Sequence, residues 1–323
     1  MALLLLAILL LLSAEYNLAY VPFSLSSGRQ WSSSQLASDA TDNNNNHNVI
    51  ADCLLRGVNI MDAVMTSEFM HSSPSLKTMY SQMIKNVEIK QSSIPDAGLG
   101  LFAKKNIKAG TIVSFYPAHA LGVDNDDQCL FVQAPQDADY FRDHPSSDSC
   151  YLHCTDQPLF RRTSLLQQQL ANDNDMPLYL DVNPHRKPIV DGWVSQFIND
   201  GAVVQSNSEE GVLDYYEATG RAKNCIHIPW GPSPVMATVT TRKVKKGQEL
   251  FTSYGSTYWL GVLLGIHGTQ GVGITPPIQA KIQETARDLL ASMQAVSVTY
   301  DQQAQAMQQE FDKVADAVGA VRE

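Results

Sequence analysis

The middle of the chain consists of short β-rich runs separated by tight turns, and this spacing restricts the fold more than any other feature. Apolar and β-branched residues gather in short runs from Val87 onward, and glycine or proline punctuates them. No long helical repeat of the kind that joins parallel strands interrupts them. The sequence therefore predicts a meander of small strands. The expected strands are 87–90, 98–103, 111–116, 178–181, 195–198, 225–228, 235–239 and 249–252.

Helical periodicity flanks this β-rich region on both sides. Residues 50–86 carry apolar side chains at intervals of three and four, which predicts one or two amphipathic helices whose methionines belong to a core. After Trp259 the pattern becomes helical again, and Thr275 with Pro276 is a typical helix start. The 4-3-4-3 spacing from Met307 to Val321 predicts a helix face that packs or pairs, over too few heptads for a coiled coil. The predicted fold class is mostly β with helical flanks.

The N-terminal segment has the pattern of a targeting leader. Residues 3–12 are all Leu, Ile or Ala, which suits a signal peptide and is too short to span a bilayer, although no Lys or Arg precedes them. Residues 1–19 are therefore expected to be a leader into the secretory pathway, and the Ser- and Asn-rich residues 20–49 a disordered linker or transit segment. Tyr20 to Phe23 resembles the two-part leaders that direct proteins to plastids in algae with secondary plastids. If the leader is not functional, the nucleus or cytoplasm is expected.

Charge narrows the range of partners. The net charge of -10 and pI near 5.2 give no general positive field for phosphates, so direct nucleic-acid binding is not expected. Residues 122–181 hold eleven Asp, no Glu and three Arg, a net charge of -8. This stretch, with an insertion over 122–176 and one helix near 164–171, either attracts a basic peptide or is a solvated loop without a partner.

The cysteines predict neither a disulfide scaffold nor a metal site. Five cysteines are too few and too irregularly spaced to staple a chain of 323 residues. Cys150, His153 and Cys154 are spaced like metal ligands, but a structural zinc needs four ligands and no second pair matches them.

Three segments far apart in the sequence carry the patterns that point to chemistry. The first runs from Gly98 to Tyr116 and has two glycines in a turn, an Ile-x-x-Gly step and a strand that ends in tyrosine. The second joins Leu180-Asp181 to Phe197-Ile-Asn-Asp-Gly201, and Asn224-Cys225 follows about two dozen residues later. The third, from Val235 to Gly255, combines a strand with Arg-x-Val-x-x-Gly-x-Glu-Leu-x-x-x-Tyr-Gly.

In this order, the three segments resemble the signature of SET-domain methyltransferases. The resemblance covers about half the chain, and its third segment is the most specific. It implies a SET-type fold of small β-sheets with a knot-like C-terminal crossing and C-terminal α-helices. The SET domain would span residues 87–260, include the acidic insertion 122–176, follow the helical N-flank 50–86, and precede a helical extension over 261–323.

The resemblance also implies a cofactor, S-adenosylmethionine, and roles for individual residues. Tyr254 matches the family's catalytic tyrosine, whose hydroxyl would orient the amine, and Tyr116 matches a second tyrosine of the lysine channel or is a buried strand aromatic. Glycines would let the backbone approach the methionine end of the cofactor. Trp259 would stack on adenine or belong to the core. The expected cofactor-binding residues are Gly98, Leu99, Gly100, Asn199, Asp200 and Trp259.

The chain departs from the family pattern at the asparagine box. Asp200 replaces the box histidine, Gly201-Ala202 replaces Ser-Cys, and an atypical excursion runs from 203 to 223. No cysteine-rich tail follows Tyr254, so Tyr258, Trp259 and the C-terminal helices would have to close the channel.

Two functions remain open. The first is a protein-lysine methyltransferase that acts on a basic, lysine-containing protein or peptide. The alternative, which the altered box suggests, is a degenerate SET module that binds a protein partner without turnover. A secreted structural protein would leave the β-rich segments unexplained.

Overall fold

The computed structural model describes residues 43–125, 128–143, 178–232, 234–264 and 275–320. Within these ranges, ten short strands form four small sheets, which confirms the predicted fold class. The strands are β1 (Val87–Gln91), β2 (Leu99–Ala103), β3 (Ile112–Tyr116), β4 (Ala120–Asn125), β5 (Gln128–Gln133), β6 (Leu178–Asp181), β7 (Asn199–Asp200), β8 (Cys225–Pro229), β9 (Met236–Thr240) and β10 (Phe251–Thr252).

Three of the four sheets are antiparallel and the fourth is a short parallel pair. β1 pairs with β2, β9 lies between β3 and β8, and β4 lies between β5 and β6. The parallel pair joins β7 to β10, with Asn199 opposite Phe251 and Asp200 opposite Thr252. This pair brings the asparagine box next to the segment that leads to Tyr254.

Three helices precede the sheets, where one or two were expected. They are α2 (Asn43–Val64), α3 (Ser67–Met70) and α4 (Pro74–Asn86). The hydroxyl of Thr66 accepts a hydrogen bond from the Phe69 amide at 3.2 Å at the start of α3, and the Ser73 hydroxyl caps α4 in the same way. Helix α2 begins before residue 50, where composition predicted linker, because adding turns to an existing helix is far easier than nucleating one.

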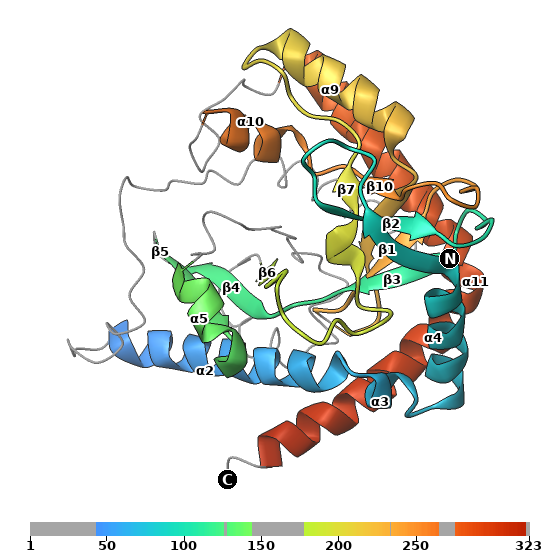
Figure 1. Cartoon of the computed structure of the whole chain (residues 1–323). Helices are drawn as coiled ribbons and strands as arrows, with labels where there is room; N and C mark the ends of the chain where they lie inside the picture. The colour runs from blue at the N-terminus through green and yellow to red at the C-terminus, as the bar shows by residue number, and fades with distance from the viewer. Residues whose placement is uncertain (1–42, 126–127, 144–177, 233, 265–274, 321–323) are drawn as a thin grey trace.

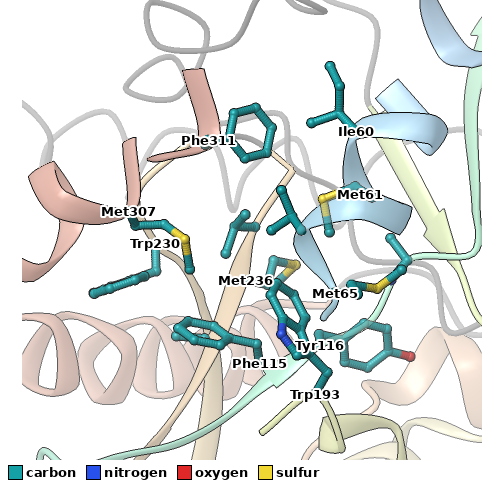
Figure 2. Packing of buried hydrophobic residues seen from close by; sticks show 14 of the residues in the cluster. Ile60, Met61, Met65, Phe115, Tyr116, Trp193, Trp230, Met236, Met307 and Phe311 are labelled. Carbon is teal, nitrogen blue, oxygen red and sulfur yellow. The ribbon is translucent and has the colours of Figure 1, made fainter. Parts of the chain in front are cut away.

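The largest buried cluster lies between these N-terminal helices, β3, β9 and the C-terminal helix (Figures 1 and 2). The methionines of α2 to α4 are core residues, as predicted. They are Met61, Met65, Met70, Met79 and Met83. A second buried cluster includes residues of β2 and of the segment that leads into β7. A third cluster consists of Val204, Val212, Tyr215, Leu260 and Ile278.

The chain ends in two helices, α10 (Ser256–Leu264) and α11 (Pro276–Ala320). The Gln279 amide donates to the Thr275 carbonyl at 2.9 Å, so the helix starts where the Thr-Pro pair predicts. Met307 and Phe311 of α11 are buried against the core, so part of the predicted apolar face packs within the chain (Figure 2).

Two expectations for the strands need correction. Residues 195–198 are not a strand: Ser195–Phe197 form a 3-10 turn, η3, in which the Ile198 amide donates to the Ser195 carbonyl at 3.0 Å. The four residues Ser195 to Ile198 are too few to show a period that separates a strand from a turn. The aperiodic insertion also contains regular structure, because it starts within β4 and includes β5, η2 (Pro135–Asp137) and α5 (Ala138–Asp143).

Several predictions fall outside the described residues. These are the leader, most of the linker, the helix near 164–171 and the Cys150, His153 and Cys154 group. Among the residues that the structure describes, no helix is both long and apolar enough to cross a membrane.

Candidate active site

The glycine turn and the asparagine box meet through the side chain of Asn199. Its amide nitrogen donates to the Leu99 carbonyl at 3.1 Å and lies 3.3 Å from a carboxylate oxygen of Glu249. These residues come from β2, β7 and the segment before β10. The structure therefore brings all three sequence segments together at one point.

Glu249 stabilises this contact between the glycine turn and Asn199. Its buried carboxylate accepts hydrogen bonds from the Ser92 hydroxyl at 2.7 Å and from the Ser93 amide at 2.7 Å. A Cβ on Gly100 would collide with the same carboxylate, so this glycine is needed for contact with Glu249. The Glu-Leu pair of the third segment thus anchors the loop before β2.

Gly98 differs from Gly100 in its surroundings. It has a φ of +68°, which favours glycine, and a Cβ built on it would meet no described atom within 4 Å. Open space beside an exposed backbone is compatible with a cofactor at the glycine turn. The next residue, Leu99, is 44% exposed.

Tyr254, near the end of the third segment, also lies next to the asparagine box. Its hydroxyl donates to the Ile198 carbonyl at 2.9 Å, directly before Asn199 in the sequence. Parallel pairing of β7 and β10 produces this contact, because Tyr254 follows β10 by two residues. The glycine turn, the Asn199 loop and the Tyr254 hydroxyl therefore converge.

Asn224 forms hydrogen bonds to the backbone of β10 and of the segment before it. Its side-chain amide donates to the Glu249 carbonyl at 2.9 Å, and its side-chain oxygen accepts from the Phe251 amide at 3.0 Å. The third segment thus runs between the asparagine box and the Asn224-Cys225 dipeptide, as the predicted C-terminal crossing requires. Burial raises the pKa of the Cys225 thiol, so this cysteine is a packing residue.

Tyr254, Tyr258 and Trp259 form one aromatic cluster at the start of α10. The rings of Tyr254 and Trp259 are stacked, with centroids 6.0 Å apart and planes at 17°. Tyr258 meets both rings edge-on, at 5.0 and 5.1 Å. One face of the Trp259 indole is thus occupied by Tyr254, and adenine stacking remains a prediction for the other.

The carboxylate of Asp200 is buried and accepts five hydrogen bonds. Its Oδ2 accepts from the Tyr254 amide at 2.8 Å and from the Trp259 indole N–H at 3.0 Å. The remaining donors are the Tyr215 hydroxyl at 2.6 Å, the Thr219 hydroxyl at 2.8 Å and the Ala202 amide at 3.1 Å. A carboxylate offers about four lone-pair sites. The protein therefore saturates it, and contact with a cofactor is left to the main chain of Asp200.

Two of these donors come from a helix that sequence reasoning missed. The excursion over 203–223 contains α9 (Glu209–Ala222), which the Ser208 hydroxyl caps by accepting from the Gly211 amide at 3.1 Å. Figure 1 shows α9 lying beyond β7 and β10, on the side of the molecule away from α2. Tyr215 and Thr219 are four residues apart and share one helix face. That spacing, together with an acid in place of the box histidine, was the available signal.

Tyr116 is buried in the main core (Figure 2). Its ring meets that of His227 edge-on, with centroids 5.4 Å apart. Its role in the lysine channel remains a prediction.

The described residues contain no group of three or more His, Cys, Asp or Glu side chains arranged to hold a metal ion.

A match to a protein-family model agrees with this geometry. The SET domain family model matches residues 98–255, which include the glycine turn, the asparagine box and Tyr254. A solved structure, CpSET8 from Cryptosporidium, aligns with 14% identity over 78% of this chain and 94% of that chain, with a TM-score of 0.30. No curated protein sequence matches the chain. Since the family model spans the three segments that converge in the structure, residues 98–255 of the chain are a SET domain.

Proposed function

We propose that the chain is an S-adenosylmethionine-dependent protein-lysine N-methyltransferase. The observation that carries this proposal is the convergence of the glycine turn, the Asn199 loop and the Tyr254 hydroxyl, through hydrogen bonds of 3.1 Å to Leu99 and 2.9 Å to Ile198. Methyl transfer to nitrogen is an in-line displacement, so catalysis depends on positioning and electrostatics.

The main chain at Gly98 and Leu99 and the Asn199 loop would hold the cofactor, which supplies an activated methyl group on a sulfonium. Gly98 fits this role because nothing described lies within 4 Å of the place a Cβ would take. Gly100 supports the turn indirectly, since its missing side chain makes room for Glu249.

Tyr254 would orient the lysine amine. Because its hydroxyl hydrogen goes to the Ile198 carbonyl, its oxygen is turned to accept a hydrogen bond from an incoming amine. A free lysine has a pKa near 10.4 and must lose a proton before it attacks. A partly dehydrated channel beside Tyr258 and Trp259 would lower that pKa, because burial disfavours the cation.

The substrate class follows from the acidic insertion. Asp139 and Asp143 are well-exposed acidic side chains on α5, within a stretch whose net charge is -8. This charge favours a basic, lysine-containing protein or peptide.

The test is methyl transfer by the purified full chain. Methyl-labelled S-adenosylmethionine and lysine-rich protein substrates are incubated with wild type, Tyr254→Phe and Tyr80→Phe, and methyl-lysine is identified by mass spectrometry. Tyr80 lies on α4 and controls for loss of a phenol outside the site. We expect Tyr254→Phe to lower the rate by about a hundredfold or more and Tyr80→Phe to leave it unchanged. No transfer by wild type, or equal rates in wild type and Tyr254→Phe, would contradict the proposal.

A second candidate is a binding module without turnover, which the saturated Asp200 carboxylate favours because the box histidine is lost. Calorimetry of the wild-type chain with S-adenosylmethionine separates the two. Absence of binding at millimolar concentration would support the binding module, and measurable binding would favour the methyltransferase.

A further inference from the structure

Tyr215 contacts the chain on both sides of Tyr254. Its hydroxyl donates to the Asp200 carboxylate at 2.6 Å and accepts from the Gly255 amide at 2.9 Å. Ser253 lies 2.9 Å from the same oxygen, and its hydroxyl must be the donor because the Tyr215 hydrogen is already used. The Tyr254 amide donates to Asp200 at 2.8 Å. One phenol and one carboxylate therefore hold three consecutive residues.

The environment keeps this phenol in its neutral, donating form. Tyr215 is buried beside Val212 and Leu260, and burial followed by the charge of Asp200 raises its pKa. A neutral hydroxyl that donates to a carboxylate makes a strong hydrogen bond. Tyr215 therefore stays a hydrogen-bond donor to Asp200 at neutral pH.

The residues that Tyr215 contacts, Ser253 and Gly255, are the direct sequence neighbours of Tyr254. The Tyr254 amide donates a hydrogen bond to Asp200, and the Tyr254 hydroxyl donates one to the Ile198 carbonyl. With the backbone fixed on both sides, the hydroxyl is aimed at the asparagine box. A displacement of about 1 Å in such a group lowers rates by about a hundredfold.

We propose that Tyr215 of the insertion helix α9 is a positioning residue for Tyr254. Helix α9 interrupts the family pattern, and Asp200 replaces the box histidine. The two changes act together, because α9 supplies hydrogen-bond donors that the buried Asp200 carboxylate needs. This proposal deepens the proposed function and rests on it where activity is concerned.

The experiment compares Tyr215→Phe with the neighbouring Tyr216→Phe in the full chain. Both variants keep the ring and lose a hydroxyl group of α9, but the Tyr216 hydroxyl bonds to Ser256 at 3.2 Å, one residue beyond Gly255. Three properties are measured: amide hydrogen exchange at residues 253–255, thermal stability, and the kcat and KM of methyl transfer.

We expect Tyr215→Phe to speed exchange of the Gly255 amide about tenfold, since that amide loses its acceptor. We also expect kcat to fall about ten- to a hundredfold with little change in the KM for the cofactor. Tyr216→Phe should leave the exchange of these amides and kcat unchanged.

The proposed function and the positioning role of Tyr215 can be contradicted independently of each other. If wild type transfers no methyl group, the proposed function fails and amide exchange alone decides the positioning role. Unchanged Gly255 exchange in Tyr215→Phe would overturn it. Where wild type is active, an unchanged kcat in Tyr215→Phe, or an equal fall in Tyr216→Phe, would overturn it as well.

Discussion

Single residues show how a changed motif keeps its place in the structure. An aspartate in the position of the box histidine suggests at first a weakened cofactor site. The structure shows a buried carboxylate with five donors, two of them hydroxyls from α9. A buried charge is tolerated only when it is paired or hydrogen-bonded in this way. The substitution and the insertion therefore belong together.

His119 is a second buried polar residue whose protonation affects stability. Its Nδ1 accepts a hydrogen bond from the Asn183 amide at 2.9 Å, and burial, with the nearby charge of Arg186 as a smaller cause, lowers its pKa to about 3. Below the unfolded pKa near 6.5, the unfolded chain binds a proton that the folded chain refuses. Stability is therefore full above pH 6.5 and is lost as the pH falls toward 3.

The change His119→Asn tests this linkage, because an asparagine oxygen can replace Nδ1 as the acceptor. Between pH 7 and pH 5, we expect wild type to lose about 2 kcal/mol more of its free energy of unfolding than the variant. Urea unfolding at each pH measures the difference. Parallel pH profiles for the two proteins would rule out His119 as the titrating group.

At the scale of elements, one arginine ties the first helix to the insertion. Arg186 bonds to Asp62 of α2 and, at 3.0 Å, to Asp137 of η2. Asp137 is only 1% exposed and also accepts from the Asn183 side chain at 2.9 Å. Burial raises the pKa of the Asp137 carboxyl, and Arg186 counteracts that effect.

The change Arg186→Met should therefore destabilise the fold by about 2–3 kcal/mol, because it leaves a buried carboxylate without its cation. Arg142→Met is the matched control: Arg142 also bonds to two carboxylates, Asp139 and Asp143, but on the exposed surface of α5. Chemical denaturation of both variants provides the comparison. Equal losses of stability would show that Arg186 contributes only as a surface ion pair.

Prediction of the elements succeeded where local pattern decides the structure and failed where distant contacts do. Strands 178–181 and 225–228 and the start of α11 at Pro276 follow from periodicity and turn residues. The two-residue β7 depends on pairing with β10, some 50 residues away, and the turn at η3 packs against β2 and β3. No local window contains these contacts.

The candidate site shows the same division. Tyr254, Asn199 and the glycine turn were found by the order of motifs. The roles of Glu249, Asn224 and Tyr215 appear only when the segments come together.

At the scale of the whole molecule, the C-terminal helix is part of the core. Its later half packs on α2 and α4, while its first turns meet α9 through Ile278 (Figure 1). One helix thus contacts both the N-terminal flank and the helix that supports the site. The extension is therefore integral to the domain.

This arrangement predicts that Phe311→Ala, which empties a buried position of α11, costs about 3–5 kcal/mol of stability. Gln309→Ala, at an exposed position of the same turn, should change stability little. Thermal unfolding of the two variants measures both effects. If Phe311→Ala unfolds at the wild-type temperature, α11 does not stabilise the core.

The most direct test of the central claim is a crystal structure of the full chain with S-adenosylhomocysteine, the product of the proposed reaction. The convergence of three segments predicts that the ligand contacts the main chain at Gly98 and the Asn199 loop, with its sulfur facing the Tyr254 hydroxyl. A ligand bound away from these residues, or none at millimolar concentration, would contradict the account.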